Sequence, residues 1–141
     1  DWRMIDDAYN ASPSSSRAAL AILKDVAGGG RTLAVLGNML ELGTYSRLGH
    51  IEVGESVQKQ SVDVLITVGH LARHIADSAR QKGHRDVREA TGNDEAAEML
   101  KTTIKPGDTV LIKGSRGMQM EDIVNAMRLH YGAGGPVDGR H

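Results

Sequence analysis

Residues 64–79, with the sequence VLITVGHLARHIADSA, show most clearly the unit from which this chain is built. Val64–Val68 is a short and almost wholly apolar run, which is typical of a strand covered on both faces of a sheet. Gly69 follows it, and apolar residues then recur at helical spacing at Leu71, Ala72, Ile75, Ala76 and Ala79. A buried strand that leads into a helix with one apolar face predicts the βα unit of an α/β fold.

The same unit recurs along the chain. Further strands are expected at Arg3–Ile5, Thr32–Leu36, Thr109–Ile112 and, with a weaker pattern, Asp86–Ala90. Because strands and helices alternate, the sequence predicts an α/β fold with three layers: a doubly wound (Rossmann-like), mostly parallel sheet of about five to six strands. No Gly-x-Gly-x-x-Gly dinucleotide fingerprint accompanies any of these strands.

Polar caps and glycines mark the expected helix boundaries. Ser12 before Pro13 predicts the start of the first helix, and Gly28 its end. Thr44 is expected to cap the second helix, and Asn93 to open the fourth. The positions expected to face the core are Ala19, Leu20, Leu23, Val26 and Ala27 in the first helix, Leu48, Ile51 and Val57 in the second, Ala96, Ala97, Leu100 and Ile104 in the fourth, and Met120, Ile123, Val124 and Met127 in the fifth.

Composition narrows the function classes. The chain has 141 residues, enough for one domain, which we place at residues 1–130, with a flexible Gly-rich tail at 131–141. Its formal net charge is −1, with one Trp, three Tyr and no Phe, so neither a basic nor a base-stacking nucleic-acid surface is expected. The absence of Cys excludes disulfides and thiolate chemistry. No apolar run is long enough to span a membrane.

In a parallel sheet, ligands bind beyond the carboxyl ends of the strands. Polar side chains and glycines gather in three of the loops expected there. The loop after the first strand carries Asp6, Asp7, Tyr9 and Asn10, the loop after the second carries Asn38, Leu40 and Glu41, and the last runs Lys113-Gly114-Ser115-Arg116-Gly117.

The last of these loops predicts an anion site. Lys113 and Arg116 supply positive charge and Ser115 a hydroxyl, while the glycines allow backbone N–H groups to approach a ligand at an expected helix N-terminus. The alternative is a basic turn whose cations face water. In the first loop, a strand-end Asp is suited to a ribose hydroxyl and the Tyr9 ring to a base, with an ordinary turn as the alternative.

Histidines and phosphate motifs give further expectations. His70 and His74 have a metal-ligand spacing, but Leu71 stands where a His-Glu-x-x-His motif has Glu, so two solvated histidines are expected. His50 is expected to be buried and hydrogen-bonded. No Gly-x-x-x-x-Gly-Lys-[Ser/Thr] phosphate loop occurs in these residues, so this chain alone is expected not to hydrolyse ATP.

Four ordered blocks resemble the C-terminal domain of the Mur ligases. They are residues 6–13 (DDAYNASP), residues 36–43 (LGNMLELG), His50, and residues 110–121 (VLIKGSRGMQME). Within that family, the blocks resemble the branch that adds D-alanyl-D-alanine. In two places the sequence departs from the usual motif: Ser12 stands where the family has Asn, and Asn38 where it has Asp, which removes a carboxylate from the second loop.

The resemblance implies one domain of a three-domain, ATP-dependent ligase of peptidoglycan precursor synthesis in the cytoplasm. ATP would phosphorylate the terminal carboxylate of UDP-MurNAc-tripeptide, and the amine of D-alanyl-D-alanine would attack the acyl phosphate. The implied cofactors are ATP and Mg²⁺, bound mainly by the central domain. The implied partners are both substrates and the enzyme's own N-terminal and central domains, so this fragment alone is expected to be inactive.

Site roles follow from the resemblance block by block. Asp6, Asp7, Tyr9 and Asn10 are expected at the nucleotide. Asn38, Leu40 and Glu41 are expected to shape the dipeptide pocket. Lys113, Ser115 and Arg116 are expected to hold the dipeptide carboxylate or neighbouring anionic groups. No catalytic residue and no metal ligand is expected in this chain.

Two alternatives remain open from the sequence. One is the C-terminal domain of a sister ligase that adds another amino acid or extends folate or cyanophycin. The other is a standalone, flavodoxin-like receiver or binding module, because Asp6, Asp7 and Lys113 resemble a receiver's acidic pocket and lysine. A receiver would carry its phospho-acceptor Asp after the third strand, where this chain has Gly69 and His70.

Overall fold

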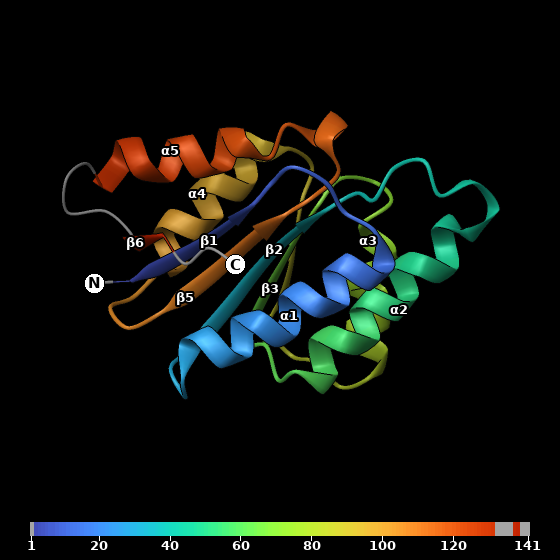
Figure 1. The fold of residues 1–141 in the computed structure, drawn as a ribbon, viewed down its shortest axis with the longest axis horizontal. Helices are drawn as coiled ribbons and strands as arrows, with labels where there is room; N and C mark the ends of the chain where they lie inside the picture. Colours follow the sequence, from blue (N-terminus) through green and yellow to red (C-terminus); the bar gives the residue numbers. More distant parts are fainter. Residues whose placement is uncertain (1, 132–136, 139–141) are drawn as a thin grey trace.

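The structure, a computed structural model, describes residues 2–131 and 137–138. Its centre is a six-stranded sheet in the order β4-β3-β2-β5-β1-β6, in which every neighbouring pair is parallel (Figure 1). The strands are β1 (Arg3–Asp7), β2 (Thr32–Gly37), β3 (Val64–Val68), β4 (Val87–Ala90), β5 (Thr109–Lys113) and β6 (Val137–Asp138). The five strands expected from the sequence are thereby confirmed.

Helices cover both faces of the sheet (Figure 1). They are α1 (Pro13–Ala27), α2 (Ser46–Lys59), α3 (Arg73–Gln81), α4 (Asn93–Thr103) and α5 (Glu121–Tyr131). Figure 1 shows α4 and α5 on one side of the strands and α1 and α2 on the other. The apolar faces of α1, α2 and α3 pack with one side of the strands, and those of α4 and α5 pack with the other. Two buried clusters separated by a sheet confirm the doubly wound, three-layer fold. No helix of the described residues has the length and apolar character needed to cross a membrane.

The first helix forms where the sequence predicts it. The Ser12 hydroxyl accepts the Ser15 N–H, and the Ser15 hydroxyl bonds back to Ser12, so both ends of a capping box are present. Pro13 occupies the first helical position, where no N–H is needed. Gly28 ends the helix with φ +55°, a left-handed conformation that glycine adopts without strain.

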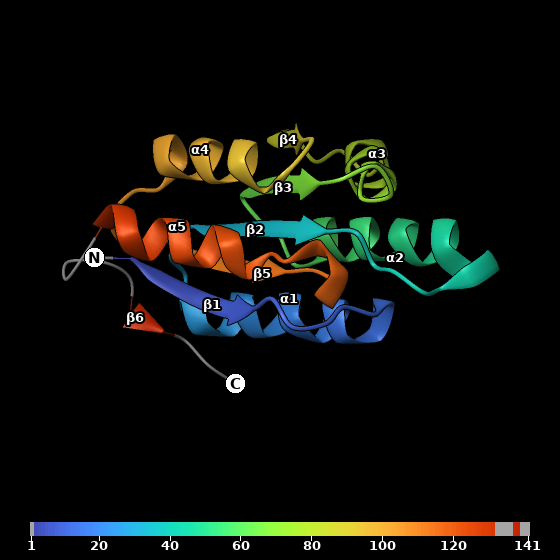
Figure 2. The ribbon, with the colours of Figure 1, turned by 90° about the horizontal axis from the view of Figure 1, so that it is seen from above.

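The start of the second helix differs from the expectation. Thr44 lies in a short 3₁₀ turn, η1 (Gly43–Tyr45), and no side-chain cap precedes α2. The side chain of Leu48, expected to face the core, is 53% exposed. Both expectations were wrong, and Leu48 is exposed because this end of α2 reaches past the strand ends, where no sheet lies beneath it (Figure 2). The third helix also begins two residues later than its apolar pattern, at Arg73.

The C-terminal segment contains structure that its composition did not predict. Tyr131 is the last residue of α5, and Val137–Asp138 pair in parallel with Arg3 and Met4 of β1. The tail expected from residue 131 therefore includes the last residue of α5 and the two-residue strand β6. Residues 132–136 and 139–141 of that predicted tail lie outside the described part of the chain.

The strand order separates this fold from a receiver. A flavodoxin-like sheet has the order 2-1-3-4-5, whereas β2 to β5 here follow the order 3-2-1-4 of the Rossmann arrangement, with β1 added beyond β5. The order in which the chain adds strands therefore reverses between β2 and β5, which is where open α/β sheets hold ligands. The helices that follow β3 and β4 also lie on opposite faces of the sheet.

Candidate functional site

The loops after β1, β2 and β5 meet at one edge of the sheet, because these three strands are adjacent and parallel (Figure 1). Ser115 ties them together. Its backbone N–H donates to the Asn38 carbonyl over 3.1 Å, and its hydroxyl accepts the Leu40 N–H over 2.7 Å. The same hydroxyl lies 3.5 Å from the Ala11 carbonyl. Ser115 is buried, so its hydroxyl fixes three loops relative to one another and does not face solvent.

Lys113 is also turned inward. Its ammonium lies 2.8 Å from Asp7 Oδ2 and donates to the Asn10 carbonyl over 3.0 Å. The side chain is 4% exposed, so neither a free anion-binding cation nor a solvated turn describes it. Asp7 is the register partner of Lys113 across β1 and β5. Two of the predicted ligand-binding side chains thus bind each other.

The crevice between β2 and β5, where a Rossmann fold holds its dinucleotide, is filled by a side chain of this protein. A Cβ added at Gly37 or at Gly114 would overlap the sulfur of Met120, which is fully buried between them. A Cβ at Gly117 would come within 2.9 Å of Leu40 Cδ1. The glycines of the last loop therefore make room for Met120 and Leu40, which gives a physical reason for the absence of a dinucleotide fingerprint.

The predicted helix N-terminus at the last loop is wrong. Residues after Ser115 form only a 3₁₀ turn, η2 (Arg116–Met118), and α5 begins at Glu121 with two acidic residues in its first turn. Of Lys113 and Arg116, the two cations expected in the anion site, only Arg116 is exposed.

A cavity of about 300 Å³ lies beside β1. It is lined by Asp6, Ala8, Tyr9, Arg116 and Glu121. Tyr9 is 79% exposed, so its ring presents an open aromatic face next to a carboxylate and a guanidinium. The structure thereby brings together Asp6 and Tyr9 from the first loop with Arg116 from the last, although they are more than 100 residues apart in sequence.

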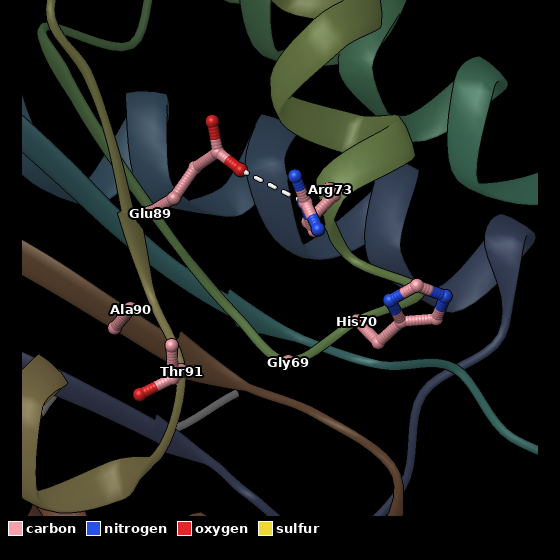
Figure 3. Close-up of a pocket in the computed structure, with 6 residues that line it drawn as sticks. All are labelled: Gly69, His70, Arg73, Glu89, Ala90 and Thr91. Carbon is pink, nitrogen blue, oxygen red and sulfur yellow. Dashed lines mark ion pairs between the residues drawn. The ribbon is translucent and has the colours of Figure 1, made fainter.

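A second cavity, of about 420 Å³, lies at the ends of β3 and β4 (Figure 3). It is lined by Gly69, His70, Arg73, Glu89, Ala90 and Thr91. None of these residues was among the predicted site residues. The available signal was that two strands end in Gly69-His70 and Thr91-Gly92, but that these strands are neighbours follows only from the sheet order.

Asn38 and His50 form hydrogen bonds to the backbone between the cavity beside β1 and the cavity at the ends of β3 and β4. The Asn38 side chain accepts the Ala72 N–H over 2.8 Å and packs against Gly69, where a Cβ would overlap it. His50 is fully buried, as predicted: it accepts the Met39 N–H over 3.0 Å and lies 2.6 Å from the Ser46 carbonyl. Burial lowers the pKa of His50 below its usual value, so the ring is neutral and donates from Nδ1 to Ser46.

The remaining predicted residues have local roles. The Asn10 side chain accepts the adjacent Ala11 N–H over 2.9 Å. Glu41 is exposed and has a left-handed φ of +64°. His70 lies in the turn before α3, and His74 lies within that helix. Within residues 2–131 and 137–138, no group of three His, Asp or Glu side chains is arranged to hold a metal ion.

Comparison with known proteins identifies the family. Residues 1–116 match the family described as Mur ligase, glutamate ligase domain. The chain belongs to the Mur ligase family. This Mur ligase domain is 38% identical over 122 residues to the UDP-N-acetylmuramoyl-tripeptide–D-alanyl-D-alanine ligase of Bacillus subtilis, a match that covers 86% of the chain and 27% of that enzyme. It is 32% identical over 127 residues to the Escherichia coli enzyme of the same name, covering 89% and 26%.

Solved structures agree with the fold. The domain superposes on MurF ligase from Thermotoga maritima, in complex with ADP, with a TM-score of 0.72 and 28% identity over 87% of this chain and 27% of that one. MurF from Acinetobacter baumannii gives a TM-score of 0.76 and 29% identity over 86% and 27%. This Mur ligase domain therefore spans about a quarter of the length of these relatives.

Proposed function

We propose that this domain is part of an ATP-dependent ligase that joins D-alanyl-D-alanine to UDP-MurNAc-tripeptide. The observation that carries the proposal is the 38% identity, over 86% of the chain, to a relative that bears this activity in its name. The family model matches residues 1–116, which include the three loops built around Ser115. Identity of this extent over a whole domain supports a shared ligand set as well as a shared fold.

The proposed reaction has two steps. The terminal carboxylate oxygen of the tripeptide attacks the γ-phosphorus of ATP, which forms an acyl phosphate and releases ADP. The amine of D-alanyl-D-alanine then attacks the acyl carbon, phosphate leaves, and the amine loses a proton as the amide forms. Catalysis of this kind depends on orientation of the reactants and on exclusion of water from the acyl phosphate. The role proposed for this domain is to supply binding surfaces that orient the reactants and exclude water from them.

The cavity beside β1 is proposed as the wall that this domain contributes to the nucleotide site. The exposed Tyr9 ring would lie against the base, and the Asp6 carboxylate would accept hydrogen bonds from ribose hydroxyls. Arg116 lines the same cavity, so we assign it to an anionic group of the nucleotide. Asp7, Lys113 and Ser115 are then positioning residues, because their polar groups hold the loops that carry these three side chains.

The rest of the site would come from other domains of the enzyme. The described residues offer no cluster for a metal ion, so we propose that Mg²⁺ is bound outside this chain, where it would offset the charge of the phosphates. Closure of this domain over the other two would exclude water from the reacting groups. The enzyme is proposed to act in the cytoplasm, where ATP is available.

The test is phosphate release by the complete enzyme that contains this domain. Release should require ATP, UDP-MurNAc-tripeptide and D-alanyl-D-alanine together, and omission of any one should reduce it to background. Replacing the dipeptide by D-glutamate, L-glutamate or aspartate should also abolish it. Turnover with one of those amines in place of D-alanyl-D-alanine would contradict the proposal and favour a sister ligase. The 141-residue chain alone should release no phosphate from ATP.

A further inference from the structure

Asn93 is the first residue of α4, but its side chain does not cap that helix. The N-cap residue is Gly92, and within the described residues no side-chain hydrogen bond caps α4. The Asn93 amide instead contacts the loop after β5: Nδ2 donates to the Met118 carbonyl over 2.9 Å and to the Gln119 carbonyl over 3.1 Å. Because Asn is a poor helix former, its presence here is explained by these two contacts and not by α4.

The contact depends on the packing of α4 against α5. These two helices lie next to each other on the same face of the sheet (Figure 1). The start of α4 therefore lies beside the loop that leads into α5, although β3 and β2 separate β4 from β5 in the sheet. The Asn93 amide thus joins the end of an edge strand to the loop that carries Arg116.

The two carbonyls determine the direction of the Asn93 amide. A carbonyl oxygen only accepts hydrogen bonds, so Nδ2, and not Oδ1, must face Met118 and Gln119. Oδ1 is then buried and has no hydrogen-bond partner in the described part of the chain. Because an unpaired buried acceptor is unfavourable, the two bonds from Nδ2 decide where this side chain lies.

The backbone that accepts these bonds has an unfavourable conformation. Gln119 has a φ of +52°, in the left-handed region that residues with a Cβ adopt only at a cost. It follows η2 directly, and its N–H donates to the Arg116 carbonyl over 3.2 Å. Such a conformation persists where surrounding contacts fix it. The Asn93 amide supplies two of these contacts, to the last residue of η2 and to Gln119.

This turn carries the residues that face the cavity beside β1. Arg116 begins η2, Glu121 follows the turn, and both line that cavity. The hydroxyl of Ser115 fixes the start of the turn to the second loop, and Asn93 fixes its end. Arg116 lies between these two anchors with its side chain exposed. A long, exposed side chain meets a ligand in a defined geometry only when its backbone is fixed.

We propose that Asn93 is a positioning residue of the nucleotide site, whose amide fixes the turn that presents Arg116 to an anionic group of the nucleotide. This inference rests on the proposed function. It adds a residue that is not part of the cavity wall and that acts on the nucleotide only through Arg116.

Binding of ADP to the complete enzyme, measured by calorimetric titration without the amine substrate, tests the proposal in a double-mutant cycle. Asn93→Asp keeps the shape of the side chain but places an oxygen against both carbonyls in place of the donor. It should weaken ADP binding about fivefold in the wild-type background, and less than about twofold in Arg116→Ala, where the contact is already lost. Asn93→Ala, which removes the donors without adding charge, should give the same pattern.

Kinetics with ATP distinguish positioning from a general loss of structure. Asn93→Asp should raise the KM for ATP and leave kcat at saturating ATP within about twofold, whereas partial unfolding would lower kcat. The matched control is Asn125→Asp, which makes the same exchange at an exposed position of α5 and should leave the ADP affinity unchanged.

Equal weakening of ADP binding by Asn93→Asp in both backgrounds, or none in the wild-type background, would overturn the proposal. So would a lower kcat with an unchanged KM, or an equal loss in Asn125→Asp, which would assign the effect to added charge. If Arg116→Ala binds ADP as tightly as the wild type, there is no contact for Asn93 to position and the proposal is wrong. The proposed function fails separately if the enzyme does not use D-alanyl-D-alanine, and the ADP affinities, which need no amine, still decide the role of Asn93.

Discussion

Lys113 Nζ lies 2.8 Å from Asp7 Oδ2, and this ion pair joins the last residues of two adjacent strands. Because β1 and β5 both end here, the pair fixes the starting points of the loops that carry Tyr9 and Arg116. The lysine side chain is 4% exposed and the aspartate 23%. Removing one partner would leave an unpaired charge in a site that water reaches poorly. The ion pair therefore stabilises the arrangement of the two loops.

Replacing this lysine should therefore cost stability. Lys113→Met is expected to lower the free energy of unfolding by about 2–3 kcal/mol, below the roughly 3–5 kcal/mol of fully buried pairs because Asp7 retains some exposure. Urea denaturation measures the change. Lys59→Met, at an exposed site at the end of α2, is the control and should cost less than about 0.5 kcal/mol. Equal stability of the two variants would show that Lys113 is a free cation after all.

The hydroxyl of Ser115 should be needed to order the second loop. Ser115→Ala leaves the partly buried Leu40 N–H without its acceptor, at a cost of about 1–2 kcal/mol. Amide hydrogen exchange checks the location of the effect: Leu40 should lose protection, while Val35 in the middle of β2 should keep it. Thr44→Ala, at an exposed position, is the control. Unchanged protection at Leu40 would contradict the assignment of Ser115 as a positioning residue.

Stability should depend on pH through His50. Because burial lowers the folded-state pKa of His50 below its unfolded value of about 6.5, the unfolded state binds the proton more readily. The stabilisation is therefore fully present above about pH 6.5 and is lost as pH falls through the folded-state pKa. Protonation would also remove the acceptor for the Met39 N–H.

Urea denaturation at pH 7.5 and pH 5 of wild type, His50→Gln and His130→Gln measures this dependence. His50→Gln should be less stable than wild type at pH 7.5 by about 1–2 kcal/mol but should lose less stability on acidification. His130 is exposed, and its replacement should leave the wild-type slope unchanged. His84, whose pKa burial also lowers, contributes equally to all three proteins. A His50→Gln protein as acid-sensitive as wild type would contradict this assignment.

The sequence predicts the fold where local signals are strong. Continuous apolar runs such as Val64–Val68 and the Ser12–Pro13 helix start are decided by neighbouring residues, and both are confirmed. Leu48 was assigned to the core because helical spacing cannot show that the start of α2 extends beyond the sheet. The two-residue strand at Val137–Asp138 was missed because its Gly-rich surroundings carry no strand pattern.

The sequence predicted which loops form the candidate site but not the directions in which their side chains point. The sequence placed polar residues at the correct sheet edge, since parallel strands all end there. It did not show that Lys113 points at Asp7, because that contact joins residues 106 positions apart. Nor did it show the cavity at Arg73, which exists because β3 and β4 are neighbours whose following helices lie on opposite faces.

The most direct test of the central claim, that this domain supplies a wall of the nucleotide site through Asp6, Tyr9 and Arg116, is the kinetics of Arg116→Ala in the complete enzyme. KM for ATP and KM for D-alanyl-D-alanine are measured for the wild type, for Arg116→Ala and for Lys105→Ala, an exposed control. The account predicts that Arg116→Ala raises the KM for ATP about tenfold, with a smaller change for the dipeptide. A larger rise in the KM for the dipeptide than for ATP would contradict it.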